Sequence, residues 1–375
     1  MTAPPWRLSA RDFAALARGG GGPGALRALR LARRSRTSLL VRMIAAAPPA
    51  RPAYRLLVDA DRADPAAVAR VLDYPSVGAW ATRTALAMRH GEPARPEDLA
   101  FVAAAAAVRA GVPVAVDLPD VPVVALPSLG VVSPAGLRGL PEVALGPRAV
   151  ALDLWAGGGV PDGLSVATDA DPHQWRAAMA AAWDELGAQP EVAREVADLV
   201  STITPMPPGP AGTTSATVAD AFGCVFLSLA PDPETLAVTL AHETQHTKLV
   251  ALMDLFPLLE PDTRAVYYAP WREDPRPLAG LLHGTYAHLG VAGFWRARRG
   301  MRAQTEFARW RAAALTAAST LLGSGKLTRV GVGFVTGIAG VLREWNAEPV
   351  HPEALARAEA EAVAHRERWE ARVGG

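Results

Sequence analysis

The segment from Ala221 to Leu255 constrains the fold more than any other. An apolar run over Ala221–Leu229 predicts a strand. The tetrapeptide Pro231-Asp-Pro-Glu then predicts the start of a helix, because an early proline and acidic side chains favour the first helical turn. That helix is expected to end near Leu255, before Pro257. We predict an α+β fold that is mainly helical, with a small mixed sheet packed beside a zincin-like helix.

The predicted helix carries an HExxH motif in its middle, His242-Glu243-Thr-Gln-His246. Residues four apart lie on one face of a helix, so both imidazoles can reach a single metal ion. Glu243 projects beside them and can contact a metal-bound water. The competing interpretation is a solvent-facing polar patch, but apolar neighbours such as Leu240 and Leu249 indicate a largely buried helix.

A catalytic metal site needs a third protein ligand besides these two histidines. A second helix is predicted to begin near Pro277, and on it His283 shares a face with Gly280 and Gly284. These small residues would permit a close approach to the HExxH helix, so His283 is the predicted third ligand. The alternative is that His283 only packs between helices. His288 is interpreted as a packing histidine, because it is five residues further along and rotated away.

Carboxylates are the other possible third ligands. No HExxHxxGxxH continuation follows the motif, which excludes a metzincin. Glu260 adjoins Pro261 just past the helix end, and Glu273 lies in a proline-rich loop, so neither is well placed on a following helix. Glu273 and Asp274 nevertheless stay open as rivals to His283.

The same proline-rich loop contains two arginines, Arg272 and Arg276. One interpretation is that they form surface ion pairs with Glu273 and Asp274. The other is that one of them binds a substrate carboxylate through two parallel hydrogen bonds, which the planar guanidinium group favours.

These motifs together resemble a known family. The HExxH motif is followed by Trp271-Arg-Glu-Asp-Pro-Arg-Pro277 and then by Leu282-His-Gly-Thr-Tyr-Ala287. This order is similar to that of the HExxH-motif proteins of peptide natural-product clusters. The resemblance is strongest over residues 221–295 and extends weakly to Ser35–Ile44. Some members of the family are fused to radical SAM enzymes, but this chain has no CxxxCxxC motif and would be a standalone version.

The resemblance implies a function. The better-understood family members are 2-oxoglutarate-dependent iron enzymes, which hydroxylate the β-carbon of a residue in a ribosomally made precursor peptide. By analogy, His242, His246 and His283 would hold Fe(II) and leave positions for 2-oxoglutarate and O2. Arg276, with Arg272 as second candidate, would bind the distal carboxylate of 2-oxoglutarate. Glu243 would orient groups around the metal.

Two other functions remain open at this point. In a zinc metallopeptidase, Glu243 would be the general base that activates a Zn(II)-bound water. In a non-catalytic peptide-binding protein, the motif would be kept for structure. The two arginines before His283 favour the oxygenase. In that case the strand Ala221–Leu229, if it is a sheet edge, could pair with an extended peptide substrate.

Composition excludes several other classes. Lys+Arg 38 against Asp+Glu 37 argues against a nucleic-acid binder, and no apolar run is long enough to span a membrane. The single cysteine, Cys224, and the lack of a signal-peptide pattern favour the cytoplasm.

The 375 residues are long enough to form a sizeable core. We predict a helical layer over residues 1–111, a metal-binding catalytic core over 112–300, and C-terminal helices over 301–375 that pack on this core.

Overall fold

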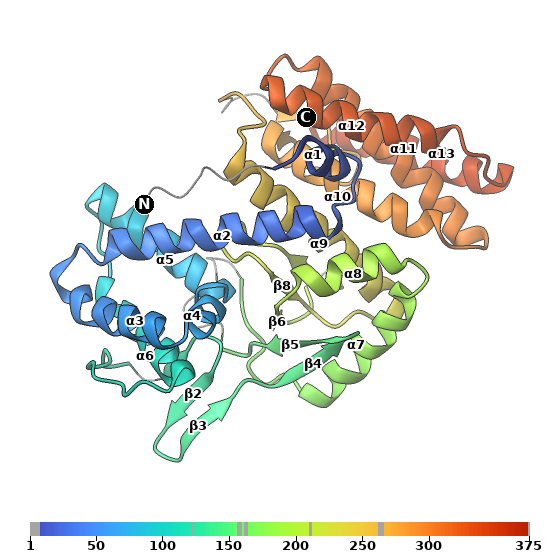
Figure 1. The fold of residues 1–375 in the computed structure, drawn as a ribbon. Coiled ribbons are helices and arrows are strands. Elements are labelled where there is room, and N and C mark those ends of the chain that lie inside the picture. Colours follow the sequence, from blue (N-terminus) through green and yellow to red (C-terminus); the bar gives the residue numbers. More distant parts are fainter. Residues whose placement is uncertain are drawn as a thin grey trace. The chain divides into compact units, whose positions relative to one another are not determined.

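The structure is a computed structural model, which describes residues 8–121, 123–155, 160, 164–209, 212–261 and 266–373 (Figure 1). The structure is 61% helical and contains small mixed and antiparallel sheets, which confirms the predicted α+β, mainly helical class. None of the helices in these ranges is both long enough and apolar enough to cross a membrane.

The chain forms two compact units, and each joins segments that are distant in sequence. The first, which we call the helical unit, contains residues 1–29, 183–196 and 237–375. The second, which we call the sheet unit, contains residues 30–182 and 197–236. The predicted division into 1–111, 112–300 and 301–375 follows consecutive segments instead, and it stays a prediction.

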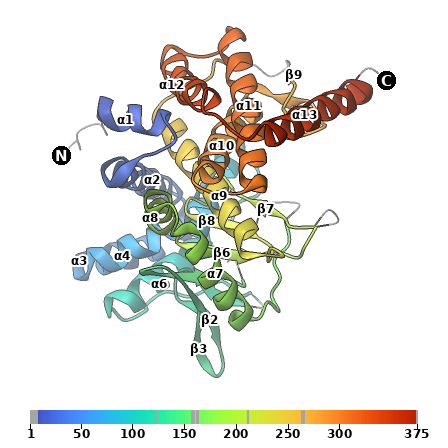
Figure 2. The same cartoon turned by 90° about the vertical axis from the view of Figure 1, so that its right-hand side faces the viewer.

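Long helices dominate the helical unit. Its elements are α1 (Ala10–Ala17), the first turns of α2 (Gly22–Ile44), the end of α7 (Pro172–Leu186), most of α8 (Pro190–Leu199) and of α9 (Pro233–Leu255), β9 (Val266–Tyr267), β10 (Arg276–Pro277), α10 (Leu278–Arg296), α11 (Met301–Gly323), α12 (Arg329–Asn346) and α13 (Pro352–Val373). Helix α11 packs against α10, α12 and α13, as both views show (Figures 1 and 2). This packing buries one long face of α10, the helix that follows the proline-rich loop.

The HExxH helix is α9, and its bounds agree with the prediction from Pro231-Asp-Pro-Glu and Pro257. Asp232 accepts hydrogen bonds from the backbone nitrogen and the hydroxyl of Thr235, each at 2.8 Å, so it caps the first turn. The strand that precedes it, β8 (Cys224–Leu227), is shorter than the predicted run Ala221–Leu229. All four of its residues are buried.

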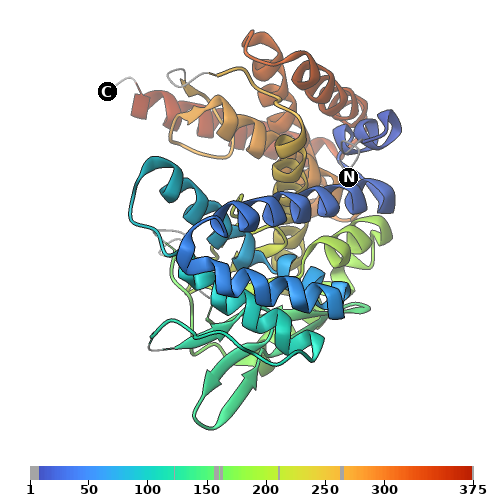
Figure 3. The same cartoon turned by 60° about the vertical axis from the view of Figure 1, so that its left-hand side comes forward.

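The sheet unit combines a helical layer with two sheets. The remaining elements are η1 (Pro48–Ala50), α3 (Arg51–Ala63), α4 (Pro65–Leu72), α5 (Pro75–His90), η2 (Pro96–Asp98), α6 (Leu99–Ala110), β1 (Val124–Leu126), β2 (Gly130–Ser133), β3 (Gly136–Gly139), β4 (Glu142–Leu145), β5 (Arg148–Leu152), β6 (Thr202–Pro205), β7 (Ser215–Ala216) and β8. Helices α3, α4 and α6 lie side by side (Figures 1 and 3). The buried alanines of α6 allow this close packing.

The larger sheet has the strand order β4-β5-β6-β8-β7. Strands β5, β6 and β8 are parallel, and the outer strands β4 and β7 pair antiparallel to them. Strand β8 therefore lies inside the sheet, between β6 and β7. The hypothesis that a peptide adds to this strand requires a free edge, and β8 is not an edge, because β7 pairs with its Phe226 and Leu227 on the side away from β6.

Two local predictions also fail. The sequence predicts one helix over residues 190–203, but α8 ends at Leu199 and Thr202–Pro205 forms the central strand β6. Threonine and isoleucine favour a strand once parallel neighbours are present on both sides. The sequence also predicts a strand over residues 164–167. The structure describes these residues and has no strand there, although the Ala167 nitrogen donates a hydrogen bond to the Pro205 carbonyl at 2.9 Å.

Candidate metal centre

The two histidines of the HExxH motif meet at their ring nitrogens. The Nε2 atoms of His242 and His246 are 3.0 Å apart, and the ring centroids are 4.7 Å apart. The i, i+4 spacing on α9 produces this contact, because it stacks the two side chains on one helix face. Both imidazoles therefore point their metal-binding nitrogens at the same point in space, as the sequence predicts.

Helix α10 adds two more imidazoles. The ring of His283 lies 5.7 Å from that of His246, and the ring of His288 lies 5.3 Å from that of His242, centroid to centroid. We call these four side chains the histidine cluster. The sequence predicts His283 as a metal ligand and His288 as a packing residue, and the structure places both beside the HExxH pair. The missed signal was that residues 283 and 288 are five apart, so both can border one wide helix face.

The orientation of His288 is fixed by its neighbours. Its Nδ1 lies 2.8 Å from the carbonyl oxygen of Gly284. A carbonyl can only accept, so Nδ1 carries the proton and Nε2 keeps a free lone pair. Trp271 stacks on the imidazole at a centroid distance of 4.4 Å, and Trp310 of α11 lies 4.6 Å away. A hydrogen bond from the other ring nitrogen to a carbonyl is the usual support of a metal-ligating histidine.

Burial keeps the histidine cluster neutral. Desolvation lowers the pKa of His242 and His283 below the usual value and lowers the pKa of His246 still further. For His288, burial and the neighbouring His242 lower the pKa to about 3. A neutral imidazole is the form that binds a metal ion, so all four rings are in the ligating state at neutral pH.

The donor pair fits a divalent metal ion. In an octahedral site, two adjacent nitrogens bound at about 2.1 Å make a right angle at the metal ion. The distance between these nitrogens is then about 3.0 Å. The pair His242 and His246 matches this separation. Among the described residues, no third histidine, cysteine or carboxylate completes a ligating group with them. His283 and His288 are the neighbours from which a third donor can come.

Glu243 is buried beside the donor pair. Its side chain is 3% exposed, and its Oε1 lies 4.0 Å from Nε2 of His242. The carboxylate also raises the pKa of His242, against the larger effect of burial. Glu243 can therefore contact a water molecule bound to a metal ion at this histidine.

The two arginines of the proline-rich loop share one carboxylate. Asp274 accepts from Arg272 at 2.6 Å and from Arg276 at 3.3 Å, and these contacts lower its pKa. This agrees with the ion-pair interpretation for Asp274. Glu273 instead pairs with Arg368 and Arg372 of α13. Both carboxylates therefore pair with arginines in this structure, which favours His283 over them as the third donor.

Arg276 and Trp271 lie directly on the N-terminal half of α10. A Cβ added at Gly280 would lie 3.1 Å from Nε of Arg276, and one added at Gly284 would lie 2.3 Å from Cζ2 of Trp271. These glycines were expected to admit the HExxH helix, and that expectation is wrong, since they admit an arginine and an indole. The close approach to α9 occurs instead at Gly290, where an added Cβ would lie 2.5 Å from Cγ of Gln245.

A buried ion pair holds α9 from its other side. Lys248 is two residues after His246, which places it about 200° around the helix axis. Its ammonium group is fully buried and donates to Glu195 Oε2 at 2.7 Å and to the carbonyls of Gly19 and Gly20 at 2.7 and 3.2 Å. All three protons are thereby satisfied, as a buried ammonium requires.

The candidate carboxylate after α9 lies on the surface. Glu260 is exposed, and its backbone nitrogen donates to the carbonyl of Lys326 at 2.8 Å.

Comparison of the sequence with protein-family models and with curated proteins finds no significant match. The histidine cluster and its surroundings are therefore the basis for any inference about function.

Proposed function

We propose that this protein is an Fe(II)/2-oxoglutarate-dependent oxygenase that hydroxylates the β-carbon of a residue in a ribosomally made precursor peptide. The observation that carries the proposal is the 3.0 Å contact between Nε2 of His242 and Nε2 of His246, with two further neutral imidazoles beside it. The nature of the peptide substrate rests on the motif resemblance described above. Fe(II) and a free thiol both favour a reducing compartment, so we expect the protein to act in the cytoplasm.

In this proposal His242 and His246 hold the metal and His283 supplies the third donor. Non-haem iron oxygenases more often use two histidines and one carboxylate, but Glu273 and Asp274 are held by arginines. Fe(II), when bound, supplies the activation of O2 by electrons drawn from 2-oxoglutarate. Trp271 and Trp310 exclude water from the His288 side of the cluster.

Arg276 is the preferred partner for the distal carboxylate of 2-oxoglutarate. Arg272 and Arg276 share the single carboxylate of Asp274, which leaves one positive charge uncompensated within that group. The guanidinium of Arg276 lies over Gly280, three residues and so about one helical turn before His283. A five-carbon diacid with one end at the histidine cluster would direct its other end toward this charge.

Zinc-dependent peptide hydrolysis is the second candidate. The observation that favours it is Glu243, whose Oε1 lies 4.0 Å from Nε2 of His242. In that reaction Glu243 would take a proton from the attacking water and then transfer it to the leaving amine. In the oxygenase Glu243 has no such proton to remove, and its role is to orient groups beside His242.

The two functions differ in what happens to 2-oxoglutarate and to the peptide. The metal-free protein is loaded with Fe(II) under anaerobic conditions, titrated with 2-oxoglutarate, and then exposed to O2 with a short peptide encoded beside its gene. We expect succinate, CO2 and a peptide that gains one oxygen atom in the mass spectrum. Two peptide fragments formed with Zn(II) in the absence of O2 would overturn the oxygenase and support the peptidase.

A further inference from the structure

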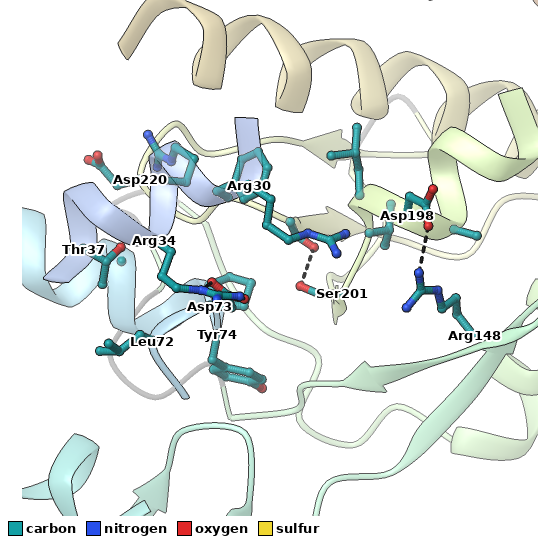
Figure 4. Close-up of a pocket in the computed structure, with 18 of the residues that line it drawn as sticks. Arg30, Arg34, Thr37, Leu72, Asp73, Tyr74, Arg148, Asp198, Ser201 and Asp220 are labelled. Atoms are coloured by element: carbon teal, nitrogen blue, oxygen red, sulfur yellow. Dashed lines mark hydrogen bonds and ion pairs between the residues drawn. The ribbon is translucent and has the colours of Figure 1, made fainter. Parts of the chain in front are cut away.

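The sheet unit contains a polar pocket that is separate from the histidine cluster (Figure 4). Its volume is about 200 Å³, and every residue that lines it belongs to the sheet unit. Side chains of α2, the loops around α4 and α5, strand β5 and the end of α8 form its walls. Residues 220–223, which precede β8, complete the walls, so five separate segments of the chain build the pocket.

One face of α2 supplies most of the positive charge. Arg30, Arg34 and Thr37 follow the i, i+4, i+7 spacing that places side chains along one helix face, and all three line the pocket. From the opposite wall, Arg148 of β5 faces them. In Figure 4 the guanidinium group of Arg30 extends into the space between Ser201 and Asp198.

The other arginines of this region are already held. Arg34 forms a two-point contact with the carboxylate of Asp73. Arg148 donates to Asp198 at 2.8 Å, and Arg36 donates to Asp220 at 3.2 Å.

Arg33, the remaining arginine of the pocket, pairs with a backbone carbonyl. Arg33 donates to the carbonyl of Ala219 at 2.6 Å and lies over the ring of Phe222. Thus each aspartate of the pocket already pairs with an arginine other than Arg30.

Arg30 differs from these arginines. Within the described part of the chain it makes no hydrogen bond and no ion pair, although its side chain is half-buried and always protonated. Burial and the nearby Arg148 and Arg34 lower its pKa, while Asp73 and Asp198 raise it. A guanidinium that is partly removed from water without a partner is a costly arrangement, and an anion in the pocket would relieve it.

We propose that the pocket binds a carboxylate group, which Arg30 holds through two parallel hydrogen bonds. A single guanidinium fork matches the two oxygens of one carboxylate. Asp73 and Asp198 flank the fork and disfavour a doubly charged phosphate. Leu72, Pro75 and Phe222 supply apolar wall for a short aliphatic stem behind the carboxylate. The carboxylate can belong to a small organic acid or to an acidic side chain of a peptide. This site is independent of the proposed oxygenase function.

Ligand-observed NMR of the metal-free full-length protein tests the proposal with butyrate, neutral butyramide, inorganic phosphate and the peptide acetyl-Gly-Glu-Gly-amide. We expect saturable binding of butyrate or of the peptide, and much weaker binding of butyramide and phosphate. Stronger binding of the peptide than of butyrate assigns the carboxylate to a peptide side chain, and the reverse order assigns it to a small acid.

Substitutions then assign the binding to Arg30. Arg30→Gln should weaken carboxylate binding about 10- to 100-fold, as the loss of a charge-assisted hydrogen bond predicts. Arg30→Lys should also weaken it, because an ammonium group lacks the fork. Arg27→Gln, at an exposed position one turn earlier on α2, is the matched control and should bind like the wild type. Equal binding of butyramide and butyrate, tighter binding of phosphate, or unchanged binding in Arg30→Gln with an unchanged melting temperature would overturn the proposal.

Discussion

The imidazole of His288 lies nearly parallel to the indole of Trp271, with ring centroids 4.4 Å apart and planes inclined by 14°. The two residues come from different elements, since Trp271 precedes β10 and His288 lies in the middle of α10. Gly284 makes the stack possible, because a side chain at this position would occupy the space of the indole. The proline-rich loop is thereby fastened to the helix that carries His283 and His288.

The first prediction concerns Gly284. Gly284→Ala should lower the free energy of unfolding by about 1–3 kcal/mol, because its methyl group would overlap the indole of Trp271 and force it to move. Gly333→Ala is the matched control, since Gly333 lies on α12 with open space around it. An alanine there should stabilise the helix by about 0.5–1 kcal/mol. Thermal unfolding measures both variants, and equal melting temperatures would contradict the packing described here.

The second prediction concerns the third metal ligand. His283→Ala should weaken Co(II) or Fe(II) binding at least about 10- to 100-fold. Loss of a residue that only supports a metal ligand already weakens metal binding by this factor, and loss of a ligand should weaken it no less. His173→Ala, an exposed histidine of the sheet unit, should bind metal like the wild type. Equilibrium dialysis with metal analysis gives the affinities. Wild-type affinity in His283→Ala together with loss in His288→Ala would transfer the third position to His288.

The third prediction concerns Arg276. Arg276→Ala should raise the 2-oxoglutarate concentration needed for half-maximal succinate formation about 10- to 100-fold, because one charged two-point contact is lost. Arg276→Lys should also be impaired. Arg368→Ala removes an arginine that pairs with Glu273 on the surface, and it should leave this requirement unchanged. An unchanged requirement in both Arg276→Ala and Arg272→Ala would place the carboxylate contact elsewhere.

The fourth prediction separates the two candidate reactions through Glu243. Glu243→Gln keeps the size of the side chain but removes its ability to accept a proton. We expect this variant to retain iron and to form succinate from 2-oxoglutarate. A peptidase would instead lose about 10²–10⁴-fold in rate, the usual contribution of a general base. Loss of peptide cleavage in this variant, measured with Zn(II) and without O2, would support the peptidase.

The fifth prediction concerns the single cysteine. Cys224 is buried in β8 beside Thr204, and burial raises the pKa of its thiol to about 12. At pH 8 its thiolate fraction is then about 1,000-fold below that of an unfolded chain, because each pKa unit is a factor of ten. Native protein should therefore react very slowly with a thiol reagent, and denatured protein should react fast.

The same shift makes stability depend on pH. Between about pH 9 and pH 12 the unfolded thiol releases its proton while the folded one keeps it, so the stability should fall as the pH rises through this range. Cys224→Ser removes this contribution. An equal decline in stability over that range in the wild type and in Cys224→Ser would contradict the assigned pKa.

Much of the local structure could be predicted because its signals are local. The segment Pro231-Asp-Pro-Glu and Pro257 predict the bounds of α9, and the i, i+4 spacing predicts the contact between His242 and His246. The helix α3 was not predicted, although its amphipathic pattern buries Leu56 and Leu57. The strand β6 was mistaken for the end of a helix, because a strand is stabilised by neighbours that the local sequence does not contain.

The sequence by itself determined the mainly helical α+β class, the long HExxH helix and the pairing of two histidines on one face, since backbone geometry fixes which residues of a helix lie together. Only the tertiary structure decided which residues from other elements meet this face. In the tertiary structure His288 lies beside His242, and Trp271 stacks on His288. Asp274 pairs with two arginines, and Arg30 has no partner in the described chain. Those contacts join residues that are far apart along the chain, and the packing of whole helices determines them.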